Sequence, residues 1–146
     1  MAGWRDDVSE QAGNDLDTLY FAAVEMAKKL LEKNNELFPI GVALMFDGTT
    51  EYVGVDPAVL GEAPTATDVI DALYDTFRSF APTFRAVGMA IDIHIATLDT
   101  DAIDVRMEHS EGFGLAVQLP YRRDAATGEY VYAAAIATDH ERSVWP

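Results

Sequence analysis

Apolar residues recur at three- and four-residue steps over residues 14–33, while charged residues mostly fill the opposite face. This spacing predicts an amphipathic helix. Asn14 or Asp15 is expected to cap its start, and Asn34 and Asn35 are expected to end it. The apolar stripe consists of Leu16, Leu19, Tyr20, Ala23, Met26, Ala27, Leu30 and Leu31.

The apolar period then falls from 3.6 to 2 over residues 40–46, which predicts a β-strand. Asp47 and Gly48 follow, and this pair favours a two-residue hairpin turn. With that turn, Val42 is expected to lie opposite Val53 on the returning strand.

A second amphipathic helix is predicted to start at a cap formed by Thr65 or Thr67 and to end before Pro82. Its stripe is Ile70, Leu73, Tyr74, Phe77 and Phe80 or Ala81. Four further strands are predicted to form a meander, over residues 87–97, 103–109, 113–122 and 130–138.

The predicted element order is therefore αββαββββ. Each helix has one apolar stripe to bury on a sheet face, and antiparallel strands can leave the other face in water. We expect a two-layer α+β domain over residues 14–146, with two helices and an antiparallel sheet of about six strands. Residues 1–13 show no apolar period and are predicted to form a flexible arm, from which Trp4 can dock elsewhere.

The element order resembles the roadblock and profilin-like scaffolds. A fourth strand stands where the roadblock pattern has a closing helix, so neither a GTPase partner nor dimerisation is carried over from that resemblance. Residues 38–48 and 101–123 resemble small bacterial proteins of unknown function, and this resemblance implies no activity.

Composition adds one unusual feature to this picture, a strong negative charge. The chain of 146 residues has 25 acidic and 10 basic side chains, which gives a formal net charge of −15. Such a field repels nucleic acid and anionic lipid and attracts basic proteins, although an acidic surface also serves solubility alone. Absence of cysteine excludes a thiolate metal site and fits a reducing compartment, so we expect a cytoplasmic protein without a signal peptide or a membrane span.

Polar candidates for chemistry lie on the third and fourth predicted strands. If Ile93 lies opposite Val105, the polar face places Asp92 opposite Arg106 and His94 opposite Asp104. Glu108 extends this row. We interpret the row as a ladder of ion pairs and as a candidate binding site. A zinc site on Asp92 and His94 is the alternative, and Arg106 opposes it because its charge would repel the metal ion.

His109 raises the question of a general base. Pairing Val105 with Val117 places His109 opposite Phe113, leaves a three-residue loop and puts Gly112 in the left-handed position of a bulged hairpin. Glu108 and His109 then point to opposite faces and cannot act on one substrate atom. We therefore interpret His109 as a partly buried turn residue and assign no catalytic residue.

The last predicted strand carries a candidate interface. Its alternation places Tyr130, Tyr132 and Ile136 beside Pro120 on the face that is expected to be wet. The patch is expected to mediate homodimerisation through the last strand, or to be covered by a terminal segment.

Two functions remain open. The first is a non-enzymatic interaction module, immunity-like or regulatory, which binds a basic protein partner. The alternative is a small-molecule binding protein or a hydrolase with a polar pocket on the sheet. DNA mimicry is weaker, because the charges follow no recognisable spacing. No cofactor is expected.

Overall fold

Three α-helices and seven β-strands make up the computed structural model, which describes residues 3–146 apart from the side chain of Pro57. The elements are the 3-10 turn η1 (Trp4–Asp7), α1 (Glu10–Asn34), β1 (Ile40–Met45), β2 (Thr50–Val53), α2 (Pro57–Leu60), α3 (Ala66–Ser79), the 3-10 turn η2 (Ala81–Thr83), β3 (Phe84–Ile95), β4 (Thr100–His109), β5 (Phe113–Arg123), β6 (Tyr130–Tyr132) and β7 (Ile136–Asp139). The predicted α+β class and element order are confirmed. A short α2 is added, and the last predicted strand is divided in two.

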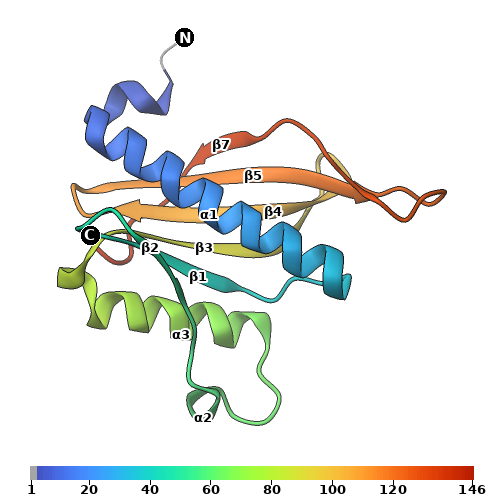
Figure 1. The fold of residues 1–146 in the computed structure, drawn as a ribbon, viewed down its shortest axis with the longest axis horizontal. Coiled ribbons are helices and arrows are strands. Elements are labelled where there is room, and N and C mark those ends of the chain that lie inside the picture. The colour runs from blue at the N-terminus through green and yellow to red at the C-terminus, as the bar shows by residue number, and fades with distance from the viewer. Residues whose placement is uncertain (1–2) are drawn as a thin grey trace.

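All strands pair antiparallel, in the order β2-β1-β3-β4-β5-β6. β7 pairs with residues 115–118 of β5, on the same edge of β5 where β6 pairs with residues 121–123. α1 crosses the front of the sheet diagonally, and β7 lies at its upper edge (Figure 1). No helix in residues 3–146 has the length and apolarity needed to cross a bilayer.

The helix boundaries follow local capping chemistry. Ser9 caps α1 by accepting a hydrogen bond from the amide of Ala12, so the helix begins ahead of the expected cap near Asn14. Asn35 ends it in the left-handed conformation, at φ 57°, as expected. Thr65 caps α3 in a reciprocal capping box with Asp68, which confirms one of the two predicted caps.

The two long helices bury their stripes on opposite faces of the sheet. α1 packs over β1, β3 and β4, with a core formed by Leu16, Leu19, Ala23, Ala27, Leu31, Val42, Leu44, Ala86, Ala90, Ile103, Val105 and Met107 among others. α3 packs on the other face, with a core that includes Ala43, Val69, Leu73, Phe77, Phe84, Val87, Met89, Ile91 and Val144. The face that was expected to be wet is therefore partly covered.

The register between β3 and β4 corrects the predicted ladder. Val105 lies opposite Ala90, and Ile93 lies opposite Ala102, because the connecting turn has four residues instead of three. The pairing is displaced by an odd number of residues from the predicted one. Each side chain of β3 therefore points to the opposite face of the sheet from the face that was predicted. Alanine and glycine of β3 face α1, while Met89 and Ile91 face α3.

The first hairpin also differs from its prediction by one residue. Gly41, not Val42, lies opposite Val53, and the loop has three residues, closed by Gly48 at φ 91°. A third loop residue shifts the register by one, which turns Val42 toward α1 and Ala43 toward α3.

We predict that the α1 side of β3 does not accept a larger side chain. Ala90 is fully buried against α1, so Ala90→Ile should lower the free energy of unfolding by about 2 kcal/mol or more. Met89→Leu conserves volume on the α3 side and should cost less than about 1.5 kcal/mol. Urea unfolding of both variants measures the difference, and equal losses would contradict the assigned faces.

Candidate binding groove

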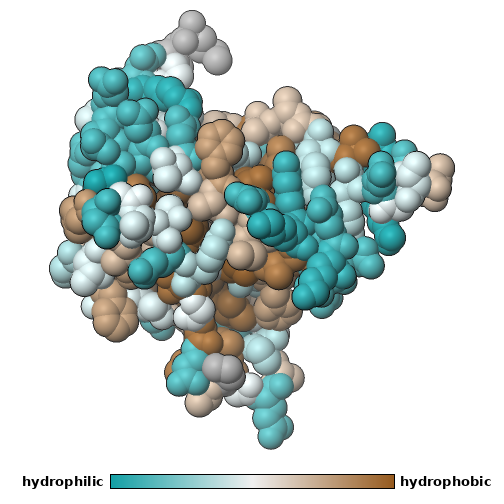
Figure 2. All heavy atoms as spheres, viewed as in Figure 1, coloured by the Kyte–Doolittle hydropathy of each residue, from teal (hydrophilic) through white to brown (hydrophobic). Residues whose placement is uncertain are grey.

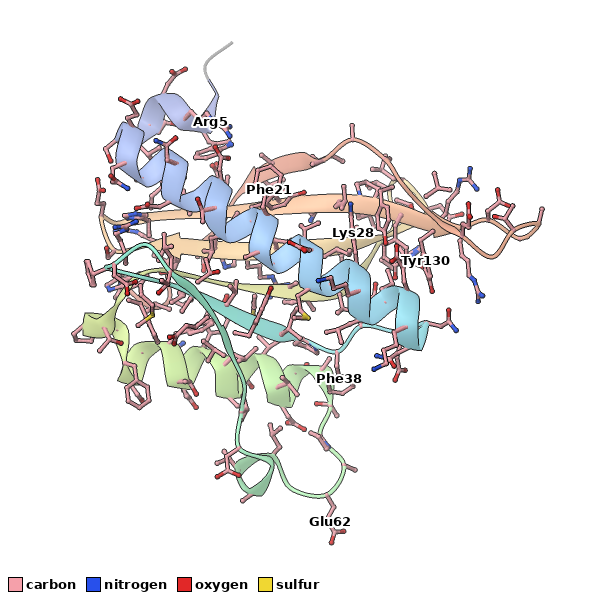
Figure 3. All side chains as sticks on the ribbon, viewed as in Figure 1. Arg5, Phe21, Lys28, Phe38, Glu62 and Tyr130 are labelled. Carbon is pink, nitrogen blue, oxygen red and sulfur yellow. The ribbon has the colours of Figure 1, made fainter. Side chains whose placement is uncertain are left out.

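An open hollow of about 290 Å³ lies between α1 and the outer strands β5 and β7. Most of its lining is apolar, and Phe21 projects from α1 toward β7 (Figure 3). Its residues are Trp4, Arg5, Leu16, Asp17, Tyr20, Phe21, Met107, Leu115, Val117, Ala135 and Ala137. We call it the α1–β7 groove.

Phe21 is the most conspicuous side chain of the groove. Its neighbours Leu16 and Leu19 are fully buried, whereas 67% of Phe21 is exposed. Pale and brown atoms fill the space between the upper half of α1 and β7 in Figure 2, and teal atoms of the N-terminal turn border them. A large exposed ring beside a hollow is typical of a surface that buries apolar area on binding.

The N-terminal turn η1 forms one end of the groove. Trp4 stacks on Phe113 of β5, with the ring centroids 6.3 Å apart, and Arg5 lies over the Trp4 ring. A second open hollow of about 390 Å³ lies on the other side of Trp4, and both hollows are lined by Leu115 and Ala137. Trp4 therefore divides what is otherwise one surface along β5 and β7.

The charges at this surface are mainly negative. Asp17 borders the first hollow, while Asp7 and Asp139 border the second. Among the residues that the structure describes, Arg5 is the one basic residue that lines either hollow, and it pairs with Asp17. The arrangement can therefore bury an apolar group while attracting neighbouring cations.

The five predicted binding residues do not form one site. Asp104, Arg106 and Glu108 share the face of β4 that looks toward α3. Asp92 lies on the α1 face, where it accepts a 2.7 Å hydrogen bond from the hydroxyl of Tyr121. The predicted Asp92–Arg106 and His94–Asp104 pairs are therefore wrong, for the register reason given above.

His94 has other acidic partners. Its Nδ1 lies 3.0 Å from Asp101, which is directly opposite on β4, and its Nε2 lies 3.4 Å from Asp99 in the turn. The bond to Asp101 raises the pKa of His94, and the charges of both aspartates act in the same direction. In residues 3–146, no three histidine or acidic side chains converge in a way that could hold a metal ion.

Glu108 anchors the C-terminal segment. The residue is 2% exposed, and its carboxylate accepts hydrogen bonds from the consecutive amides of Ser143, Val144 and Trp145. Three donors compensate the burial of one charge. The space between Arg106, Glu108 and α3 is too narrow for a water molecule, so this polar cluster offers no open pocket.

Two further side chains complete that cluster. The hydroxyl of Tyr74 lies 3.1 Å from Nε2 of His140. Burial lowers the pKa of His140, and the positive charge of Arg106 adds to the effect. Asp104 accepts a hydrogen bond from Nε of Arg106 at 3.0 Å.

His109 is fully buried and both of its ring nitrogens are occupied. Nδ1 accepts the amide hydrogen of Glu111, so Nε2 carries the proton and donates it to Asp15, 2.7 Å away. Asp15 also accepts from Arg85 and Gln11. The predicted pairing of His109 with Phe113 and the left-handed Gly112 are confirmed. With neither nitrogen free, His109 joins α1 to the sheet and has no lone pair left for a substrate proton.

The predicted interface residues divide between two faces. Tyr130 and Tyr132 turn toward α1, where their hydroxyls donate to Asn35 and Glu32. Ile136 faces the other way, and Pro120 is buried. An extra residue between β6 and β7 shifts the pairing with β5 by one, and this bulge reverses the side-chain directions that simple alternation predicts.

The sequence reasoning missed Phe21 as a candidate. The available signal was a large aromatic residue one position outside the apolar stripe of the first helix. Ala137 lines the groove opposite α1. Trp4 was expected only to dock, and its position beside Phe113 depends on a tertiary contact.

Comparisons with known proteins do not assign the chain to a family. No protein-family model, no curated protein and no solved structure matches the chain.

We predict that His94 and His140 titrate on opposite sides of the ordinary histidine pKa of 6.5. The contribution of His94 to stability is present below that pH and lost as the pH rises through its raised pKa. Burial of neutral His140 instead destabilises the fold as the pH falls below 6.5. NMR titration of both rings measures this, and Asp101→Asn should move the pKa of His94 alone. Coincident titrations would contradict the two environments.

Proposed function

We propose that this chain is a non-enzymatic interaction module, immunity-like or regulatory, that binds a basic and apolar segment of a partner protein in the α1–β7 groove. The observation that carries the proposal is the exposed Phe21 ring beside an apolar hollow that Asp17 borders, with Asp7 and Asp139 at the adjoining hollow. The apolar surface supplies an anchor, and the carboxylates select cations and speed encounter. The proposal places the protein in the cytoplasm, which the lack of cysteine fits.

The buried polar groups support a binding function over a hydrolase. Both ring nitrogens of His109 are hydrogen-bonded, and the carboxylate of Glu108 accepts hydrogen bonds from three backbone amides. Asp104 is buried and paired with Arg106. The polar pocket of the alternative function would need these groups to face one open space, whereas Asp104 and Glu108 face α3, His109 is buried against α1, and the α1–β7 groove is mainly apolar.

A synthetic peptide of sequence Lys-Lys-Val-Thr-Val-Thr-Val-Lys-Lys, labelled with fluorescein, is a suitable probe. We predict that Phe21→Asp weakens its binding at least about tenfold, because the anchor ring is replaced by a hydrated charge. Phe38→Asp is the matched control, since Phe38 is also an exposed phenylalanine and lies at the far end of α1 from Phe21 (Figure 3). Fluorescence anisotropy gives both affinities, and equal losses in the two variants would contradict the groove.

The same probe tests the role of charge. Raising the salt concentration from about 50 to about 300 mM should weaken binding to the unmodified protein, because the Debye length shortens. An affinity that does not change with salt concentration would contradict the selection of a basic partner.

A homodimer through the last strand is the second arrangement to consider. Its support is the exposure of all four residues of β7 at the edge of the sheet. The formal charge of −15 on each copy opposes it. We predict a monomer of 16.0 kDa by light scattering in about 150 mM salt. A doubled mass that Thr138→Pro returns to the monomer would instead establish the dimer.

A further inference from the structure

β7 leaves one side of its backbone without a partner. Within residues 3–146 its strand partner is β5 alone, and all four of its residues are exposed. An edge strand of this kind presents a row of free amide and carbonyl groups to solvent. An extended peptide can satisfy these groups by adding one more strand.

The groove lies on the side where such an added strand would project its side chains. Ala137 faces α1 across the hollow, and Ala135 precedes it in the loop that leads into β7. Both side chains are small, so they leave the space above them open toward Phe21. In an added strand every second side chain points to the same face. Alternate side chains of the partner would therefore extend over Ala137 and reach the exposed ring of Phe21.

The charges at the end of β7 complete the description of the partner. Asp139 is the last residue of β7, and Asp7 of the N-terminal region lines the same hollow. A lysine or arginine just outside the apolar part of an added strand would lie near these carboxylates. A second copy of this acidic chain does not provide that charge.

We propose, building on the function proposed above, that the partner segment binds as an extended β-strand on the free edge of β7, with alternate apolar side chains in the α1–β7 groove and flanking basic residues at Asp7 and Asp139. A basic amphipathic helix is the competing occupant. Such a helix would occupy the groove and contact the carboxylates, but it would leave the edge of β7 unpaired. Blocking the backbone amides of the probe therefore distinguishes a bound strand from a bound helix.

The test uses two N-methylated forms of the Lys-Lys-Val-Thr-Val-Thr-Val-Lys-Lys probe. Amides of alternate residues in a strand point to the same edge, so methylating the amides of the first two valines blocks one edge and methylating the two threonine amides blocks the other. Charge and side chains are unchanged. Only one edge of the probe faces β7, so one isomer should lose about tenfold or more in affinity while the other changes less than about twofold.

Binding of the probe as a strand should also protect the free backbone amides of β7. In NMR hydrogen exchange of the full chain, the β7 amides that β5 leaves free should become protected when the unmodified probe binds and stay unprotected with the weakened isomer. Equal affinities for both isomers, with binding still sensitive to Phe21→Asp, would overturn the strand and keep the groove. No binding of any form would count against both proposals.

Discussion

The two faces of β3 carry side chains of different size, and this asymmetry decides where both long helices pack. Ala86, Gly88 and Ala90 form the side toward α1, where a Cβ atom on Gly88 would lie 3.0 Å from the side chain of Met107 and 3.3 Å from that of Leu19. Val87, Met89 and Ile91 form the side toward α3. The small residues let α1 pack closely on one face of β3, and the large residues bury apolar area against α3 on the other. Both contacts hold the sheet between the two helices.

The groove is a consequence of that arrangement. α1 crosses the sheet over β1, β3 and β4, which leaves part of the α1 face of β5 and β7 to the N-terminal turn and to solvent. Trp4 fills part of this space by stacking on Phe113. The remaining surface joins an exposed aromatic ring, a free strand edge and a carboxylate rim, three features that together suit an extended basic segment.

Local signals predicted the parts of the fold that local chemistry controls. The left-handed Asn35, the Thr65 cap and the three-residue hairpin at Gly112 follow from residues close in sequence, and each is confirmed. The β3–β4 register was missed because both faces of β3 are apolar, so alternation gave no preference between them. The bulge that turns Tyr132 toward α1 and the docking of Trp4 depend on contacts between distant segments, which the one-dimensional pattern does not contain.

The most direct test of this account is a cross-link across β3 and β4. The chain has no cysteine, so only introduced thiols can oxidise. Exposed His94 and Asp101 lie directly opposite each other, within the span of a disulfide, so a variant with cysteine at both positions should form the bond when the folded protein is oxidised. Mass spectrometry would show the loss of two hydrogens. Cross-linking of cysteines at His94 and Asp104 instead would mean that the faces of β3 are reversed and would contradict the positions of both helices.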